Sequence, residues 1–147
     1  VASQAALETR GLVLAVPEST ERLALDRPAL IAWDGSPPSI ATMRAALPLL
    51  ALVPSVTLFT VDEDLKGPTA DEAARYLSRH GIRAAIEHKR SDGIFPPDVP
   101  IREACDHHRV GLCVMGAYGH SKRLQDIFGG VTRRMLVKTA CPLLIAH

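Results

Sequence analysis

From Pro28 to the C-terminus, apolar runs alternate with segments in which apolar residues recur at helical spacing. The apolar runs predict five buried strands at residues 29–33, 55–61, 82–88, 110–115 and 142–146. The segments between them predict four helices at residues 37–52, 69–80, 98–108 and 131–139. Continuously apolar strands that alternate with helices are typical of a parallel sheet covered on both faces. We therefore predict an α/β three-layer sandwich with a five-stranded parallel sheet.

Local signals mark the ends of the predicted helices. Ser36 precedes two prolines and is an expected N-cap, because its hydroxyl can accept a backbone N–H of the first turn. Thr69, with Glu72 three residues later, has the spacing of a capping box. Gly81 is expected to end the second helix. Pro48 lies inside the first helix, where it would shorten or kink it.

The first 27 residues do not fit this alternation. Residues 11–16 (GLVLAV) resemble a strand that ends at Pro17, and they follow a segment that could be helical. The same order, a helix and then an apolar strand, closes the chain. We interpret residues 1–27 as an N-terminal extension, or as the remnant of a preceding repeat plus a linker, and residues 28–147 as one domain. The initial Val indicates trimming or a fragment of a longer protein.

Composition and charge exclude several classes of function. The chain has 147 residues and is 47% hydrophobic, which suffices for one core. Seventeen Lys and Arg against sixteen Asp and Glu leave no electrostatic footprint for nucleic acid or an anionic membrane. No run approaches the roughly 18 apolar residues of a membrane span, and the N-terminus is not typical of a signal peptide.

The three cysteines have no CxxC spacing, and their odd number argues against a disulfide framework. Cys113 and Cys141 lie in apolar runs and are expected to be buried thiols. We therefore expect a cytoplasmic protein. Cys105, His107 and His108 lie together on one helix, but no second cluster with metal-ligand spacing accompanies them, so we predict no metal site.

Four glycines follow the fourth strand, at Gly116, Gly119, Gly129 and Gly130. Glycine at a strand end lets the backbone approach a ligand closely or adopt a positive φ. A helix N-terminus with free N–H groups is an anion site. Together these features suit a backbone cradle for phosphates, but turns need glycine at the same places. The spacing is neither a P-loop nor GxGxxG, so the residues alone leave both interpretations open.

The same stretch resembles the universal stress protein (UspA-like) family, whose nucleotide-binding members carry G-x2-G-x9-G-[S/T]. Gly116 and Gly119 match the first two glycines, and nine residues separate Gly119 from Gly129. The segments "ALIAWDGSP" and "GGVTRRML…CPLLIAH" also look like this family, and the resemblance covers residues 28–147. It implies a Rossmann-like fold of the adenine nucleotide α-hydrolase-like type, with strand order 3-2-1-4-5. It also allows that the chain is the C-terminal domain of a tandem member.

The resemblance implies a binding site for an adenine nucleotide. Asp34 would contact the nucleoside, Ala32 would line the same edge, and Val61 would border the adenine. Met115 and Gly116 would lie beneath the ribose and phosphates. The residues expected to bind phosphates are Gly119, Gly129, Gly130, Val131 and Thr132. For Asp34 the alternative is a turn residue that bonds its own backbone near Gly35.

Position 130 departs from the family pattern, which has Ser or Thr where this chain has Gly130. The backbone N–H remains and a hydroxyl is lost, which costs about 1 kcal/mol or somewhat more and lowers the affinity about tenfold. Thr132 could supply a hydroxyl from the same helical turn. Retained but weakened binding is the expectation, and the alternative is that chains with this ending do not use ATP.

The implied function is binding of ATP or AMP, with or without Mg²⁺, in a stress-response or regulatory role. No catalytic machinery is evident; His120 and Ser121 are adjacent but have no third orienting group, so at most slow ATP hydrolysis is expected. The alternative function is an interaction module that binds no nucleotide. A third possibility is an enzyme of the adenine-nucleotide α-hydrolase-like group, which would need a second substrate pocket. The resemblance implies homodimer or tandem-domain pairing through the last strand, whose apolar edge needs cover.

Overall fold

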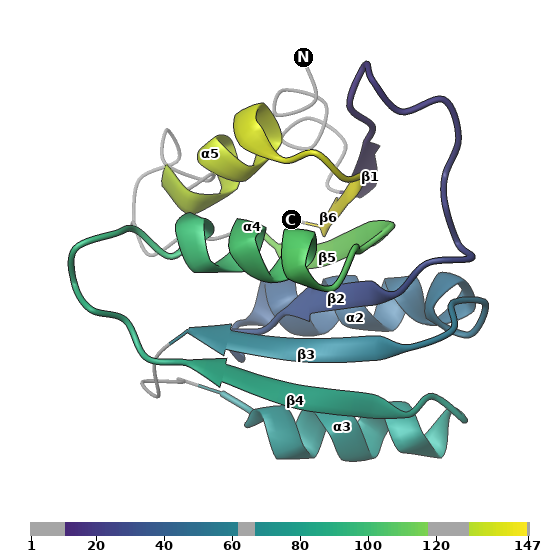
Figure 1. The fold of residues 1–147 in the computed structure, drawn as a ribbon. Coiled ribbons are helices and arrows are strands. Elements are labelled where there is room, and N and C mark those ends of the chain that lie inside the picture. Colours follow the sequence, from purple (N-terminus) through teal and green to yellow (C-terminus); the bar gives the residue numbers. More distant parts are fainter. Residues whose placement is uncertain (1–10, 62–66, 118–129, 147) are drawn as a thin grey trace.

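A six-stranded sheet forms the middle layer of the molecule (Figure 1). The computed structural model describes residues 11–61, 67–117 and 130–146, and in it the spatial order of the strands is β1-β6-β5-β2-β3-β4. The strands are Leu12–Ala15 (β1), Ala29–Ala32 (β2), Val56–Val61 (β3), Ala84–Lys89 (β4), Leu112–Gly116 (β5) and Leu143–Ala146 (β6).

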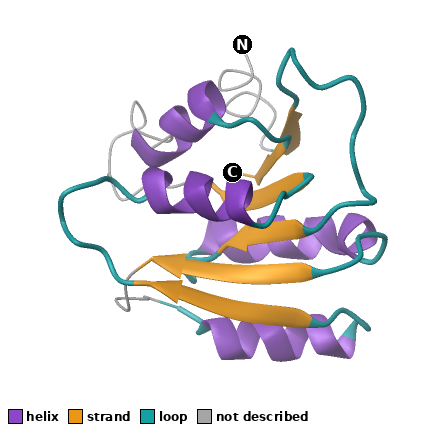
Figure 2. Cartoon of the chain, in the orientation of Figure 1, coloured by secondary structure: helices purple, strands orange, loops and turns teal. Residues whose placement is uncertain are grey.

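Within the part of the chain that the structure describes, two pairs of helices enclose the sheet, one pair on each face (Figure 2). The helices are Pro37–Leu50 (α2), Ala70–Arg79 (α3), Asp98–His107 (α4) and Gly130–Lys138 (α5). α2 and α3 pack with one side of the strands around Leu58 and Leu144, and α4 and α5 pack with the other side around Met115 and Ile145. Because side chains alternate along a strand, the continuously apolar runs supply both cores. Within the described residues, no helix is long and apolar enough to cross a membrane.

All five predicted strands are confirmed as β2 to β6, and they are parallel to one another in the expected order. The expectation of five strands was nevertheless incomplete. Residues 11–16 contain β1, which pairs antiparallel with β6 and places Val13 opposite Ile145 (Figure 1). The sheet therefore has a sixth strand and is mixed rather than wholly parallel. The physical reason is that the outer edge of β6 presents a row of backbone N–H and C=O groups, and β1 forms hydrogen bonds with them.

The predicted helix starts are confirmed. Ser36 is the N-cap of α2, and its hydroxyl accepts the Ser39 N–H at 3.3 Å. The capping box of α3 is complete, because Thr69 Oγ1 accepts the Glu72 N–H at 3.2 Å and Glu72 Oε2 accepts the Thr69 N–H at 2.8 Å. Pro48 does not end its helix, since α2 continues for two more residues.

A buried hydroxyl ties α2 to the last strand. Thr42 is fully buried in the middle of α2, and its Oγ1 donates to the Pro38 carbonyl at 2.7 Å. The same oxygen accepts the Ala146 N–H at 3.1 Å. Because buried backbone donors need a partner, this threonine satisfies an N–H group at the end of β6.

Candidate functional site

The sheet changes its winding direction between β2 and β5. These two strands are parallel neighbours, but the chain leaves β2 towards α2 on one face and leaves β5 towards α5 on the other. In open α/β sheets, ligands bind outside the carboxyl ends of the strands at such a switch point. The described members of the predicted site come from the ends of β2, β3 and β5 and the start of α5, which is this region of the fold.

Four predicted site residues belong to one apolar cluster. Ala32 and Met115 are direct partners in the β2–β5 register, and both are buried on the face covered by α4 and α5. Val61 at the end of β3 and Val131 in α5 are half-buried and pack against the same cluster. The structure therefore places these side chains around the carboxyl ends of neighbouring strands.

Gly116 makes room for the start of α2, because it has no side chain. It is not among the described glycines with positive φ. A Cβ built on it would lie 2.6 Å from the Pro38 carbonyl carbon and 2.8 Å from Ser39 Cα, and it would also meet Ser39 N. These are backbone atoms of the first turn of α2. The missing side chain thus allows β5 to approach the helix start closely, on the face opposite Met115.

Asp34 makes the turn contact considered as its alternative role. Its Oδ1 accepts the Ser36 N–H at 2.9 Å, so the carboxylate fixes the turn that leads from β2 into α2. Asp34 is half-buried and directly follows Trp33, which is buried and donates its Nε1–H to the Pro68 carbonyl at 2.9 Å. A carboxylate can accept several hydrogen bonds, so the turn contact is compatible with binding of a ligand.

The phosphate-binding residues are described in part. Gly130 is the first residue of α5, Val131 is half-buried and Thr132 is fully buried. Gly119 and Gly129 lie outside the described residues. The first N–H groups of an α-helix have no partner within the helix, and α5 has no acidic residue in its first turn to compensate them.

An ion-pair cluster beside the start of α5 was not predicted from the sequence. Asp98, the first residue of α4, is fully buried, and its Oδ1 accepts the Arg134 Nε–H at 2.6 Å. Its Oδ2 accepts Arg102 Nη2 at 3.3 Å. The available signal was the spacing of Asp98 and Arg102, because residues four apart share a helix face, and nothing in the sequence pointed to Arg134.

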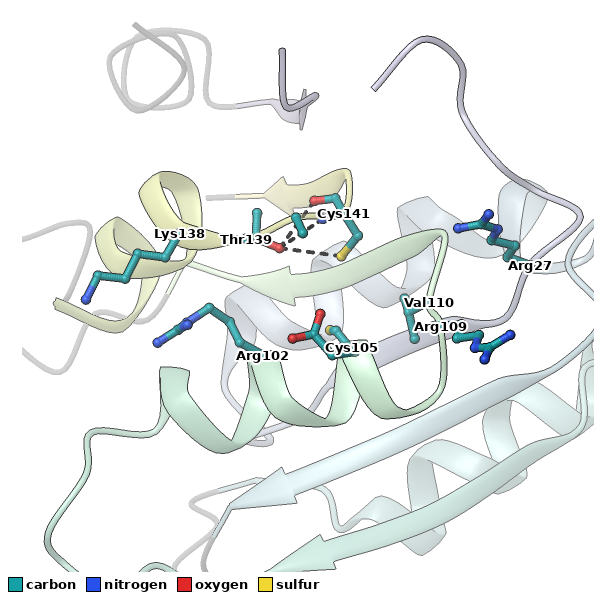
Figure 3. Close-up of a pocket in the computed structure, with 10 residues that line it drawn as sticks. Arg27, Arg102, Cys105, Arg109, Val110, Lys138, Thr139 and Cys141 are labelled. Atoms are coloured by element: carbon teal, nitrogen blue, oxygen red, sulfur yellow. Dashed lines mark hydrogen bonds between the residues drawn. The ribbon is translucent and has the colours of Figure 1, made fainter. Parts of the chain in front are cut away.

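A cavity of about 260 Å³ lies at the opposite, amino-terminal end of the strands, between the last turns of α4 and α5 (Figure 3). Cys105 and Cys141 lie in it between the basic side chains, with Arg102 and Lys138 on one side and Arg109 on the other (Figure 3). It is a poor candidate for catalysis by thiolate. Contact with the Cys113 thiol raises the pKa of Cys105, and contact with Cys105 together with burial raises the pKa of Cys141. Both thiols therefore stay protonated at neutral pH.

The cluster of Cys105, His107 and His108 is divided between two environments. Cys105 is buried, and all three cysteines are free. His108 instead contacts β4, where its Nε2 lies 2.6 Å from Glu87 Oε2. Among the described residues, no group of three or more His, Cys, Asp or Glu could hold a metal ion. His120 and Ser121 lie outside the described ranges.

No protein-family model and no curated protein matches the sequence. Solved structures do match it. Universal stress protein UspA from Lactobacillus plantarum has a TM-score of 0.65 and 16% identity, with 83% of this chain and 98% of that chain covered. A universal stress protein from Archaeoglobus fulgidus in complex with dAMP has a TM-score of 0.61 and 17% identity, with 82% and 98% covered.

A third match, a universal stress protein from Archaeoglobus fulgidus DSM 4304, has a TM-score of 0.71 and 16% identity. It covers 93% of this chain and 50% of that chain. At such identities the likeness establishes the fold, and the chain therefore has the fold of universal stress proteins.

Proposed function

We propose that the chain is a universal stress protein that binds an adenine nucleotide at the β2/β5 switch point, in a stress-response or regulatory role. The observation that carries the proposal is the register that places Ala32 beside Met115, on the face where α5 begins. The complex of an Archaeoglobus fulgidus universal stress protein with dAMP supports this choice of ligand. Free, buried cysteines are consistent with a cytoplasmic location, which is part of the proposal.

The residues divide between the two ends of the ligand. Ala32, Asp34 and Val61 would border the nucleoside, with Met115 and Gly116 beneath the ribose. Phosphates would lie at the first turn of α5, where backbone N–H groups are available. The remaining residues proposed to bind phosphates are Gly119, Gly129, Gly130, Val131 and Thr132. Thr132 is fully buried, so backbone groups rather than its hydroxyl are the main support for a phosphate here.

The first experiment is to measure the nucleotide content of the purified protein after denaturation. The stripped protein is then titrated calorimetrically with ATP and with AMP, each with and without Mg²⁺. Adenine nucleotide near stoichiometry, or micromolar binding by the stripped protein, is the expected result. Absence of bound nucleotide together with absence of heat at millimolar ATP and AMP would contradict the proposal.

Two matched variants test the nucleoside end. Asp34→Asn keeps an Oδ1 that can accept the Ser36 N–H, but it removes the charge offered to a ribose. Asp92→Asn is the control, because Asp92 Oδ1 also accepts a backbone N–H two residues later, from Ile94 at 2.9 Å. We expect Asp34→Asn to weaken AMP binding about tenfold and Asp92→Asn to leave it unchanged. Equal affinities in the two variants would remove Asp34 from the site.

The second candidate function, an interaction module, is favoured by one face of β1. Leu12 and Leu14 are 44% and 39% exposed, Val16 beyond them is 50% exposed, and Val13 and Ala15 pack against the core on the other face. β1 is also the terminal strand of the described sheet, so its outer edge is available for pairing. We propose that another domain, in a homodimer or a tandem chain, covers this strip. Failure of nucleotide binding combined with concentration-dependent association would favour this function.

A further inference from the structure

The guanidinium of Arg134 occupies the space that a side chain at position 130 would need. A Cβ built on Gly130 would lie 2.7 Å from Arg134 Nη1, 3.1 Å from Nη2 and 3.2 Å from Cζ. Helical side chains lean towards the N-terminus, so a residue one turn along the helix reaches back over its first residue. Glycine at position 130 is therefore what allows the guanidinium to lie at the start of α5.

A buried carboxylate holds this guanidinium in place. Arg134 Nε donates to Asp98 Oδ1 at 2.6 Å, and Asp98 is completely buried. A short charge-assisted bond to a buried partner restricts the arginine to one orientation. The bond uses Nε, so Nη1 and Nη2 are the donors that lie over Gly130.

The described side chains around the start of α5 carry more positive than negative charge. Arg134 and Arg102 share the single carboxylate of Asp98. Asp98 is also the acidic residue in the first turn of α4, whereas the first turn of α5 has none. Two guanidinium groups thus share one carboxylate, and among the described residues the positive end of α5 has no acidic side chain in its first turn. An anion at the start of α5 would balance it.

We propose that Arg134 is a phosphate-binding residue, with Nη1 and Nη2 donating to phosphoryl oxygens beside the first-turn N–H groups of α5. This inference rests on the proposed function, and it identifies the group that replaces the hydroxyl expected at position 130. Gly130 is then a requirement of the site rather than a loss, because a serine or threonine would displace the arginine. The ligand class is a phosphate ester or polyphosphate bound through its charged end.

The test compares three probes in calorimetric titrations: adenosine, AMP and inorganic tripolyphosphate. We expect Arg134→Gln to weaken AMP and tripolyphosphate binding by roughly tenfold or more and to leave adenosine binding unchanged. Arg133→Gln is the matched control, because it removes the same charge from the exposed neighbouring position of α5. We expect it to change each affinity by less than about twofold.

Arg134→Gln breaks a buried ion pair and can therefore fail to fold. A second variant keeps the test decisive in that case. Gly130→Ser keeps Arg134 and Asp98 and adds a hydroxyl, so a hydroxyl-based site would bind AMP more tightly. Displacement of the guanidinium predicts weaker AMP binding instead. Tighter or unchanged AMP binding in Gly130→Ser would overturn the inference.

The outcomes separate this inference from the proposed function. If wild-type protein binds AMP and Arg134→Gln matches Arg133→Gln, the role of Arg134 is wrong and the nucleotide function stands. If tripolyphosphate binds in an Arg134-dependent manner while adenosine fails to bind and AMP binds no more tightly than tripolyphosphate, the arginine site stands and the adenine preference is wrong. If none of the probes binds to wild-type protein, both are overturned.

Discussion

Replacing Gly116 by alanine tests whether the backbone contact between β5 and α2 controls the geometry of the site. A Cβ at this position would lie 2.6 Å from the Pro38 carbonyl carbon, whereas ordinary contact begins at 3.4 Å. The first turn of α2 would therefore have to move by at least about 0.8 Å, since the Cβ lies closer still to Ser39 N. Because the opposing atoms are backbone rather than the end of a flexible side chain, this displacement moves the whole helix start.

Two costs combine in this variant. Overpacking a well-packed contact costs about 1–3 kcal/mol. The Ser39 N–H is already 3.3 Å from the Ser36 hydroxyl, so a displaced first turn also loses its N-cap bond, which is worth about 1 kcal/mol. We expect Gly116→Ala to lose about 2–4 kcal/mol of unfolding free energy, or roughly 10 °C in Tm for a chain of this length.

Gly81→Ala is the control for glycine conformation without crowding. Gly81 follows α3 with a φ of +76°, and nothing lies within 4 Å of a Cβ built on it. Its substitution costs only the left-handed backbone, about 1–2 kcal/mol. Urea unfolding can be followed by fluorescence of Trp33, which is buried and is the only tryptophan.

The same Gly116→Ala protein should bind AMP more weakly, because Asp34 bonds to the backbone that leads into α2. The reasoning is refuted if Gly116→Ala unfolds at the same urea concentration as wild type with the same m-value. That result would mean that the helix start moves away from β5 at no cost. A stability loss equal to that of Gly81→Ala would also contradict it, since crowding would then add nothing.

Three further predictions concern the edge of the sheet, the buried hydroxyl and the thiols. Deleting residues 1–17 removes β1 and uncovers the outer edge of β6, so light scattering should show self-association; an unchanged mass would contradict this. Thr42→Val should cost about 1–3 kcal/mol and speed amide exchange at Ala146, whereas Thr42→Ser keeps the hydroxyl and should leave that exchange slow. Because the pKa values of Cys105 and Cys141 are raised in the folded protein, above about pH 8.5 these thiols ionise in the unfolded chain but stay protonated in the folded one. The free energy of unfolding in reducing buffer should therefore fall as the pH rises further, by at most about 1.4 kcal/mol per pH unit for each thiol. The fall should be less steep for Cys141→Ser, and equal slopes would refute the assignment.

The local signals along the chain predicted most of the elements because each depends on neighbouring residues alone. The capping box of Thr69 and Glu72 needs only three residues of spacing, and the apolar run from Leu143 to Ala146 identifies a buried strand wherever it lies in the sheet. Pro48 was less informative about where its helix ends. Pro48 removes one helical hydrogen bond, but packing of α2 on β5 and β6 maintains the helix to Leu50.

The candidate site was predictable only in part. The family resemblance implied Ala32, Val61, Met115 and Val131 as site residues, and the structure places them in one apolar cluster. The role of Gly116 could not be deduced, because nothing in its neighbours along the chain indicates that α2 crosses behind it.

The sequence by itself determined the strands and helices, their order and the class of fold, because apolar periodicity and capping are short-range properties of the chain. Tertiary structure alone decided which distant groups meet. It paired β1 with β6, brought the Thr42 hydroxyl within hydrogen-bond distance of the Ala146 N–H, and joined Asp98 of α4 to Arg134 of α5. These pairings depend on strand order and helix packing, which bring together residues 36 to 134 positions apart with no local signal of their meeting.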